Sequence, residues 1–234
     1  MISVVIPTLN EGRNLQSCFD SLLNQTFKDF EVLIVDGGSH DSTVQIAERN
    51  GIPVMHVLKK RPHDVSAARN QGMRAAKGDV MVFLDADTTL SRNCFEVVSD
   101  HFRPNDVVGV SCQTFPLEGN GLEHLFYKCN NLLIDAANKL KKNQLSYFSC
   151  LAYRRAPLVR IGGFREDLQA CEDLDLARRL STYGRFVFTR ETYCLTSPRR
   201  LRKWSYGGYF EKYVRYLSQY YLLGRVTEFY EDLS

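Results

Sequence analysis

The sequence lacks a long hydrophobic run. No stretch approaches the roughly 20 consecutive apolar residues of a membrane-spanning helix, although 44% of the 234 residues are hydrophobic. The start, Met1–Pro7, is a short apolar segment broken by proline, without the basic residues that open a secretory signal. We therefore expect a cytoplasmic protein, or a peripheral one on the inner face of a membrane.

Paired cysteines and a strong charge of either sign are also lacking. The seven cysteines are odd in number, scattered, and form no C-x-x-C pair, which argues against a disulfide framework and against metal-ligand spacing. We expect single buried thiols in a reducing compartment. The 30 Lys and Arg residues against 27 Asp and Glu leave a net charge of +3, too small an excess to indicate nucleic-acid binding.

Strand-like and helix-like segments alternate through about residue 103. Their apolar spacing predicts strands at 2–6, 31–35, 54–58 and 80–84, and helices at 14–25, 42–49, 66–77 and from Ser91. Alternation of this kind is typical of βαβ units. It predicts an α/β fold whose central sheet is mostly parallel and covered by helices on both faces.

The second half of the chain is less regular. Strands are predicted at 107–115, 147–153 and 185–189, and helices at 122–140 and 173–180. Beyond Trp204, steps of three and four predict an amphipathic helical tail with one aromatic stripe, made of Tyr206, Tyr209, Phe210, Tyr213, Leu217, Tyr220 and Tyr221. We divide the chain into a domain over 1–204, with halves 1–103 and 104–204, and a tail over 205–234.

Polar residues gather directly after three of the predicted strands. These clusters are Thr8–Glu11, Asp36–Asp41 and Asp85–Thr88. In an open α/β sheet, ligands bind outside the carboxyl ends of the strands. We therefore expect three clusters that are distant in sequence to converge on one crevice.

The last of these clusters, Asp85-Ala86-Asp87, follows the most apolar strand. Two carboxylates one residue apart on a turn can both face a hard cation, and oxygen ligands suit Mg²⁺ or Mn²⁺. A solvated turn that caps the next helix has the same pattern. The pair alone therefore leaves both interpretations open.

Several motifs in order carry a resemblance to a known family. Residues 5–11 (VIPTLNE), 34–43 (IVDGGSHDST), 66–72 (SAARNQG) and 85–87 (DAD) together resemble family 2 glycosyltransferases. Gly162-Gly163-Phe164 and Glu172-Asp173 look like that family's acceptor-side motif. The resemblance implies a GT-A fold and inverting transfer of a sugar from a nucleotide-diphosphate sugar to an acceptor hydroxyl. Asp64 stands where many relatives have glycine.

The resemblance also implies roles for single residues. Asp173 is implied as the base that takes the proton of the acceptor hydroxyl, with Glu172 as the alternative, whereas Asp175 is expected to be exposed. Asp87 is implied as a direct ligand of Mg²⁺ or Mn²⁺, and Asp85 as a residue near the ribose and the metal. The implied nucleotide-binding residues are Pro7, Thr8, Asn10, Glu11, Asp36, Arg69 and Asp85.

A basic segment over 199–204 loosely resembles the Q-x-x-R-W element of processive members. Arg200 stands for Gln and Lys203 for Arg, and we expect both to face the diphosphate. The alternative is a basic patch on a solvated or membrane-facing loop. Because no multi-span region follows Trp204, the resemblance favours a stand-alone transferase that adds a single sugar.

The expected partners follow from the resemblance and the tail. The donor is expected to carry UDP or GDP, because both bases offer ring N–H groups, and the acceptor to be a saccharide or a lipid-linked sugar. No nucleic-acid partner is expected. A basic segment beside an aromatic helix suits an anionic membrane surface. The same stripe can instead pack on the domain or on a second subunit.

Two alternative functions are compatible with parts of the sequence. Residues 85–89 (DADTT) also fit the D-x-D-x-T motif of haloacid-dehalogenase-like phosphatases, in which Asp85 would be the nucleophile beside Mg²⁺. A non-catalytic nucleotide-sugar-binding module is the other alternative. The phosphatase interpretation leaves the contexts of Asp36 and Arg69 unexplained.

Overall fold

The computed structural model describes residues 1–57, 64–139 and 149–226. Its first half contains the elements β1 (Ile2–Thr8), α1 (Leu15–Leu23), β2 (Phe30–Asp36), α2 (Thr43–Arg49), β3 (Val54–His56), α3 (Val65–Ala75), β4 (Val80–Leu84), β5 (Thr88–Leu90) and α4 (Cys94–His101). Its second half contains β6 (Val107–Pro116), α5 (Gly121–Lys139), β7 (Cys150–Arg154), α6 (Arg155–Arg160), α7 (Glu172–Leu180), β8 (Arg185–Thr196) and α8 (Arg199–Leu223).

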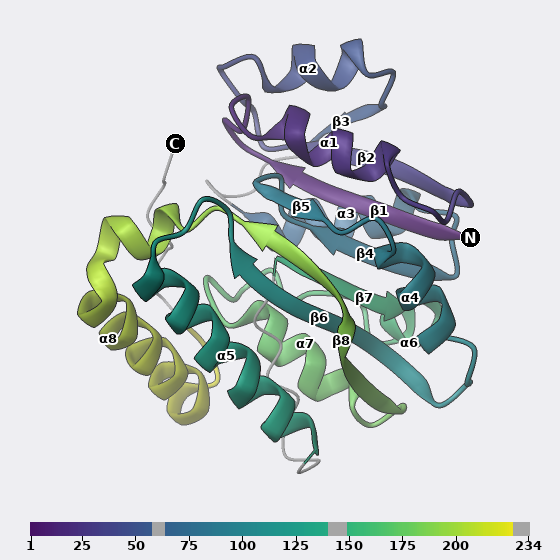
Figure 1. Cartoon of the computed structure of the whole chain (residues 1–234). Helices are drawn as coiled ribbons and strands as arrows, with labels where there is room; N and C mark the ends of the chain where they lie inside the picture. The colour runs from purple at the N-terminus through teal and green to yellow at the C-terminus, as the bar shows by residue number, and fades with distance from the viewer. Residues whose placement is uncertain (58–63, 140–148, 227–234) are drawn as a thin grey trace.

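Among the described residues, the strands form one sheet in the order β3-β2-β1-β4-β7-β6-β8-β5 (Figure 1). The first four are mutually parallel, as are β6 and β8, whereas β7 runs antiparallel to both of its neighbours and β5 antiparallel to β8. The predicted α/β fold is therefore confirmed. The antiparallel β7 could not be predicted, because a strand's direction depends on the pairing partner that tertiary packing selects.

The two faces of the sheet are covered by different helices. Val82 and Leu84 of β4 pack in a core with α1, α2 and α4. Met81 and Phe83 of the same strand pack in a second core with α3, α6 and α7. Since successive side chains of a strand point to opposite faces, the unbroken apolar sequence of β4 reflects burial on both sides.

The ends of the parallel strands bring the polar clusters together. β1 runs through Pro7 to Thr8, and the register pairs Thr8 with Asp36 at the end of β2. β4 lies on the other side of β1 in parallel, and Asp85 follows its last residue. The predicted convergence of the three clusters at one edge of the sheet is thus what the structure shows.

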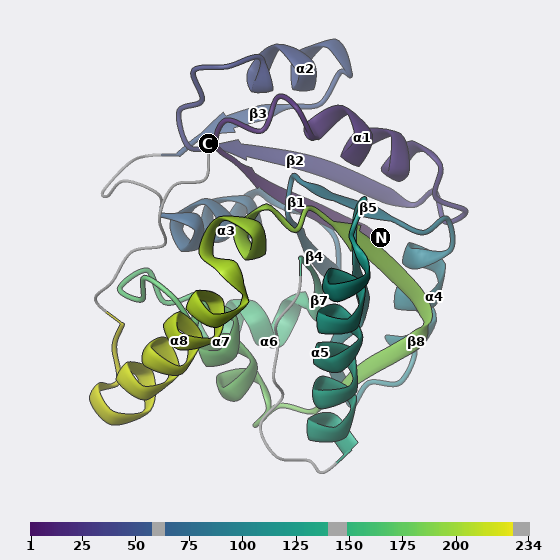
Figure 2. The same cartoon turned by 60° about the vertical axis from the view of Figure 1, so that its left-hand side comes forward.

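The tail helix begins earlier than the aromatic pattern indicated. α8 starts at Arg199 and contains one non-helical residue, Ser205, whose φ of 59° divides a short basic segment from the longer aromatic one. Figure 2 shows the long part of α8 beside α7. Tyr216 and Tyr220 are buried there, while Phe210 is 70% exposed, so the predicted single stripe is divided between two faces.

Other expectations differ in detail from the structure. The helix α6 and the strand β5 were not predicted, and β8 continues to Thr196, well beyond 189. Parts of the strands expected at 54–58 and 147–153, the end of the helix expected at 122–140, and the tail after 226 lie outside the described residues. The proposed boundary at residue 205 stays a prediction. Within the part of the chain that the structure describes, no helix combines the length and hydropathy of a membrane span.

Candidate active site

The loops after β1 and β2 are joined by hydrogen bonds. The backbone N–H of Gly37 donates to the carbonyl of Thr8 over 2.7 Å. The N–H of Asn10 donates to the hydroxyl of Ser39 over 2.9 Å, and the Asn10 side chain accepts from the N–H of His40 over 2.9 Å. Asn10 has a φ of 54°, a left-handed conformation that asparagine tolerates better than most residues. The two loops therefore form one rigid wall.

The buried carboxylate of Asp36 stabilises these two loops by hydrogen bonds. One of its oxygens accepts from the hydroxyls of Thr8 and Ser39, and the other accepts from the N–H groups of Gly38 and Ser39. Burial alone would raise the pKa of Asp36, but these hydrogen bonds outweigh burial and lower the pKa below its ordinary value. The carboxylate thus stays ionised, and its acceptor positions are filled by the protein's own turn.

A second cluster surrounds the buried guanidinium of Arg69. One terminal nitrogen lies 3.1 Å from Glu172 and 3.1 Å from Asp173, and the other lies 3.3 Å from Asp85. The guanidinium also lies over the ring of Phe164, 5.3 Å from its centre. Glu172 and Asp173 begin α7, whereas Asp85 follows β4. One side chain therefore connects the donor half of the predicted site to the acceptor half.

The charges in this cluster do not balance, since three carboxylates face one guanidinium. Burial, helped by the charges of Glu172 and Asp85 and opposed by Arg69, raises the pKa of Asp173 to about 7. A carboxylate with such a pKa can take up a proton near neutrality, as a general base requires. Asp173 is also a fifth exposed, so a ligand can reach it.

A third cluster is formed by Asp87, Arg199 and Glu11. The Nε atom of Arg199 lies 3.3 Å from Asp87, and its terminal nitrogens pair with both oxygens of Glu11. Burial and the charge of Asp85, opposed by Arg199, raise the pKa of Asp87 to about 6. The turn is held by the hydroxyl of Thr196, which donates to Asp87 over 3.4 Å. Arg199 was not among the predicted site residues, although it opens the basic segment.

The D-x-D turn fits a divalent cation by the chemistry of its donors. Asp85 and Asp87 supply carboxylate oxygens only, the ligand type that Mg²⁺ and Mn²⁺ prefer. Asp85 is 39% exposed, which leaves it accessible. Burial, with the charges of Asp85 and Glu11, raises the pKa of Asp87 against the two arginines nearby, and a bound cation would favour the ionised carboxylate.

The two predicted diphosphate ligands differ in position. The charge of Arg200 lowers the pKa of both Asp87 and Asp173, so this guanidinium lies near both carboxylates. Arg200 also lies over Trp204, 5.9 Å from its ring centre. Lys203 is exposed one turn further along α8. Arg199 and Arg200 thus act on the carboxylates of the site, and the role of Lys203 stays a prediction.

Asp175 is a correction to the sequence analysis. It was expected on the exposed face of α7, but it is 4% exposed. Its carboxylate pairs with Arg179 over 2.6 Å and accepts from the hydroxyl of Tyr220 over 3.0 Å. Asp175 therefore ties α7 to the tail helix, a role that depends on a residue 45 positions away and leaves no local signal.

The motif at 66–72 is bonded directly to the one at 162–164. The Asn70 side chain donates to the carbonyl of Phe164 over 2.9 Å and accepts from its N–H over 2.8 Å. Gly163 has a φ of 73°, and a Cβ there would lie 2.4 Å from the Asn70 oxygen. Only glycine fits this approach without strain. The contact fixes α3, and hence Arg69, against the segment that leads to α7.

Comparisons with known proteins identify the family of this chain. Residues 3–162 match the model of glycosyl transferase family 2. An uncharacterized glycosyltransferase of Haemophilus influenzae is 24% identical over 228 residues, 95% of this chain and 77% of the relative. The chain spans about a third of the length of several other curated relatives that it matches.

Solved structures show the same fold. A mannosyltransferase from Pyrobaculum calidifontis in complex with GDP-Man and Mn²⁺ has a TM-score of 0.71 at 23% identity, covering 92% of this chain and 64% of that one. A glucosyl-3-phosphoglycerate synthase from Mycobacterium tuberculosis, in complex with Mn²⁺, UDP-glucose and phosphoglyceric acid, has a TM-score of 0.64 at 19% identity, covering 97% and 81%. With these folds and the matched family model, the chain belongs to glycosyl transferase family 2 and has the GT-A fold.

Proposed function

We propose that the protein transfers a sugar from a nucleotide-diphosphate sugar to an acceptor hydroxyl, with inversion at the anomeric carbon. The observation that carries this proposal is the guanidinium of Arg69, which joins Asp85 on the donor side to Glu172 and Asp173 on the acceptor side. A single displacement needs these two sides within one site, because attack and departure occur together at one carbon. Neither the phosphatase nor the non-catalytic alternative has support from the matches.

Asp173 is the proposed base. It takes the proton of the acceptor hydroxyl while that oxygen bonds to the anomeric carbon and the bond to the diphosphate breaks. Because its pKa is raised to about 7, the Asp173 carboxylate binds a proton strongly enough to act as a base near neutral pH. Glu172, at 9% exposure, is less accessible to an acceptor, and its proposed part is to hold Arg69.

Negative charge develops on the diphosphate as it leaves. A divalent cation, when bound, offsets this charge, and Asp85 and Asp87 are the residues that would hold it. Mn²⁺ accompanies the nucleotide sugar in the two solved structures described above. Arg200 is the proposed direct partner of the diphosphate, because its charge already acts on both Asp87 and Asp173.

The wall formed by the loops after β1 and β2 is the proposed nucleoside site. Asp36 accepts a ring N–H of the base once the hydroxyl of Thr8 or Ser39 rotates away from it. Uracil and guanine both present such a group. We therefore propose UDP or GDP as the donor nucleotide, with Thr8, Asn10 and Glu11 lining the pocket.

The test is a thermal-shift screen of UDP-, GDP- and dTDP-sugars, each with Mn²⁺ and with EDTA. A true donor binds the folded state and so raises the melting temperature. At a concentration of a hundred times its dissociation constant, it adds about 2.7 kcal/mol to the free energy of unfolding. We expect one nucleotide class to do so only with the metal, followed by release of that nucleoside diphosphate when a saccharide or lipid-linked acceptor is added. Equal shifts for all three nucleotides with EDTA would contradict the proposal.

The proposed acceptor is lipid-linked, because two helices next to the site expose apolar side chains. Phe126 of α5 packs on Tyr209 of α8, with ring centres 5.3 Å apart. Both helices also present large apolar residues to solvent: Leu122, Leu125, Leu132 and Leu133 on α5, and Phe210, Val214, Tyr221, Leu222 and Leu223 on α8. The exposed Lys203 complements an anionic lipid surface. We propose peripheral membrane association through these helices.

Flotation with anionic vesicles at low and high salt tests the membrane proposal. Replacing Phe210 and Leu222 together by Ser should reduce flotation at least several-fold, because partitioning depends on buried apolar area. The matched control is Leu23→Ser on α1, which is 67% exposed in the first half of the chain. Equal flotation of the variant and the control, or none by the unaltered protein, would contradict membrane binding.

A further inference from the structure

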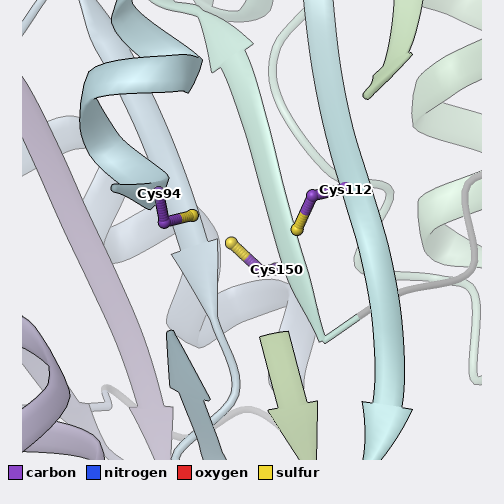
Figure 3. A group of neighbouring side chains, drawn as sticks. All are labelled: Cys94, Cys112 and Cys150. Carbon is purple, nitrogen blue, oxygen red and sulfur yellow. The ribbon is translucent and has the colours of Figure 1, made fainter. Parts of the chain in front are cut away.

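Three buried thiols from separate elements meet in the core between the sheet and α4. Cys94 begins α4, Cys112 lies in β6, and Cys150 begins β7. Their Sγ atoms all lie within 4.8 Å of one another, and Figure 3 shows the three sulfurs turned toward one another. None of these residues is more than 3% exposed. The sequence did not predict this, because 18 and 38 positions separate them and metal-site signatures are local.

Further polar groups surround this thiol cluster. Cys194 of β8 faces Cys112 and lies 3.3 Å from the hydroxyl of Thr114. The thiols of Cys112 and Cys150 are hydrogen-bonding neighbours of the Cys94 thiol. Cys94 also stands at the N-terminus of α4, where the helix dipole favours a thiolate. The cluster thus combines four neighbouring thiols with the positive end of a helix.

The spacing of the sulfurs suits a metal ion. Zinc–sulfur bonds are about 2.3 Å long, so ligating sulfurs lie about 4 Å apart. The three Sγ atoms are within 4.8 Å, and a contraction of less than an ångström brings them to that spacing. Packing alone also explains a single buried cysteine. It does not explain three thiols whose sulfur atoms converge from a helix start and two strands.

Charge decides which class of ion fits. Three thiolates without compensation cannot be buried in an apolar core. A divalent ion leaves one net negative charge, next to the positive end of α4, whereas a monovalent ion leaves two. We propose that Cys94, Cys112 and Cys150 form a buried three-thiolate site for a soft divalent cation of the zinc class, with Cys194 beside it. Each ion bound releases the three thiol protons.

This site is separate from the D-x-D turn but borders it. Leu84 pairs with Cys150 across the sheet, and the N–H of Asp85 donates to the carbonyl of Ser149. Leu90, after the same turn, pairs with Cys194. An ion in the thiol cluster would therefore brace the strands that carry the turn. It is distinguished from an ion at the turn by its sulfur ligands.

The full-length chain is refolded from the reduced, denatured state with Zn²⁺, or with Cd²⁺ as a spectroscopic probe. It is then washed with EDTA and excess Mg²⁺, which strips the exposed carboxylates but not a buried thiolate site. We expect about one zinc per chain after denaturing release, and the ultraviolet charge-transfer absorption of cadmium thiolates. Carboxylates give no such absorption, so cadmium bound at the D-x-D turn would not contribute to this signal.

The variants Cys112→Val and Cys150→Val remove ligands and retain a side chain of similar volume. Each should reduce bound zinc at least tenfold and abolish the absorption, while Cys18→Ala, a buried thiol outside the cluster, should retain both. Equal metal content in Cys112→Val and Cys18→Ala would overturn the proposal. So would an unaltered chain that holds neither zinc nor cadmium, whether or not either valine variant folds.

Discussion

Two of the arginines near the D-x-D turn, Arg69 and Arg199, differ in their surroundings. Arg69 comes from the middle of α3, is 7% exposed, and faces three carboxylates. Arg199 is the first residue of α8, is 33% exposed, and faces two. Each guanidinium forms an ion pair with one carboxylate of the turn, Arg69 with Asp85 and Arg199 with Asp87. The buried arginine is therefore a fixed part of the fold, whereas the exposed one can change partners when a ligand arrives.

This comparison separates two functions within one acidic site. The Arg69 cluster contains Asp173, the proposed base, and its geometry is fixed by the contact between Asn70 and Phe164. The Arg199 cluster contains Asp87, the proposed metal ligand. Changes in the first cluster should affect turnover, and changes in the second should affect metal and donor binding.

The largest effect is expected from Asp173→Asn. Turnover should fall by roughly 10²–10⁴-fold, the usual contribution of a general base, while the thermal shift produced by donor and Mn²⁺ is retained. Steady-state kinetics and the thermal shift measure the two quantities. The control is Asp106→Asn, an exposed partner of Arg185. If Glu172→Gln causes the loss and Asp173→Asn does not, Glu172 is the base.

The pH profile sharpens the same assignment. Because the pKa of Asp173 is raised to about 7, the carboxylate is protonated and inactive as a base below that pH. The rate should therefore fall about tenfold per pH unit below about 7 and level off above it. In Asp173→Asn the residual rate should lose this acidic limb. An unchanged limb in the variant would assign the titration to another group.

The next effect is expected from Asp87→Ala. Loss of a metal ligand removes charge stabilisation of several kcal/mol from the transition state, and about 4 kcal/mol corresponds to roughly 10³-fold in rate. Donor binding should lose its dependence on Mn²⁺, and circular dichroism should show a retained fold. Full activity in EDTA, in either form of the protein, would show that the turn holds no essential metal.

A smaller effect, an increase rather than a loss of Mn²⁺ affinity, is expected from Arg199→Gln. Removing the cation beside Asp87 should strengthen Mn²⁺ binding without donor by about two- to fivefold, since a partly exposed ion pair contributes up to about 1 kcal/mol. Titration calorimetry measures this affinity. Arg202→Gln is the matched control, because Arg202 lies on the same helix and pairs with Glu123 instead. Equal affinities in both variants would remove Arg199 from the cation site.

The smallest effect is expected from Tyr220→Phe, outside both clusters. It removes the hydrogen bond to Asp175 and should cost about 1 kcal/mol of unfolding free energy, with turnover unchanged because Asp175 keeps its pair with Arg179. Urea denaturation measures the loss. Tyr221→Phe, at a 51% exposed neighbour, should cost less. A loss of turnover in Tyr220→Phe would show that the tail positions the base.

The first half of the chain could be predicted closely because its signals are local. Each strand of that half is a short apolar run, and each cluster stands at a strand end, so the parallel pairing brings Thr8, Asp36 and Asp85 to the same edge of the sheet. Contacts between distant segments could not be predicted to the same depth. Asp175, Arg199 and the three clustered cysteines take their partners from segments distant in the chain, and composition and periodicity contain no record of such pairs.

Asp36 shows a further limit of pattern matching. Its motif placed it at the base-binding position, and the structure shows that four donors from Thr8, Gly38 and Ser39 already saturate it. A motif specifies the position of a residue, whereas the number of hydrogen bonds left for a ligand depends on the final turn geometry. Its role toward the nucleotide stays a prediction.

The bond between Asn70 and Phe164 has a consequence for how such chains can diverge. Asn70 fills the space that a side chain at position 163 would need, and its amide satisfies both backbone groups of Phe164. A Cβ at 163 would also lie 2.9 Å from Met73, and the φ of 73° would strain it, so the glycine is needed as long as this contact is kept. Two segments more than 90 residues apart are thus expected to be retained or replaced together. A recombination breakpoint between them should succeed only when both parents share this pair.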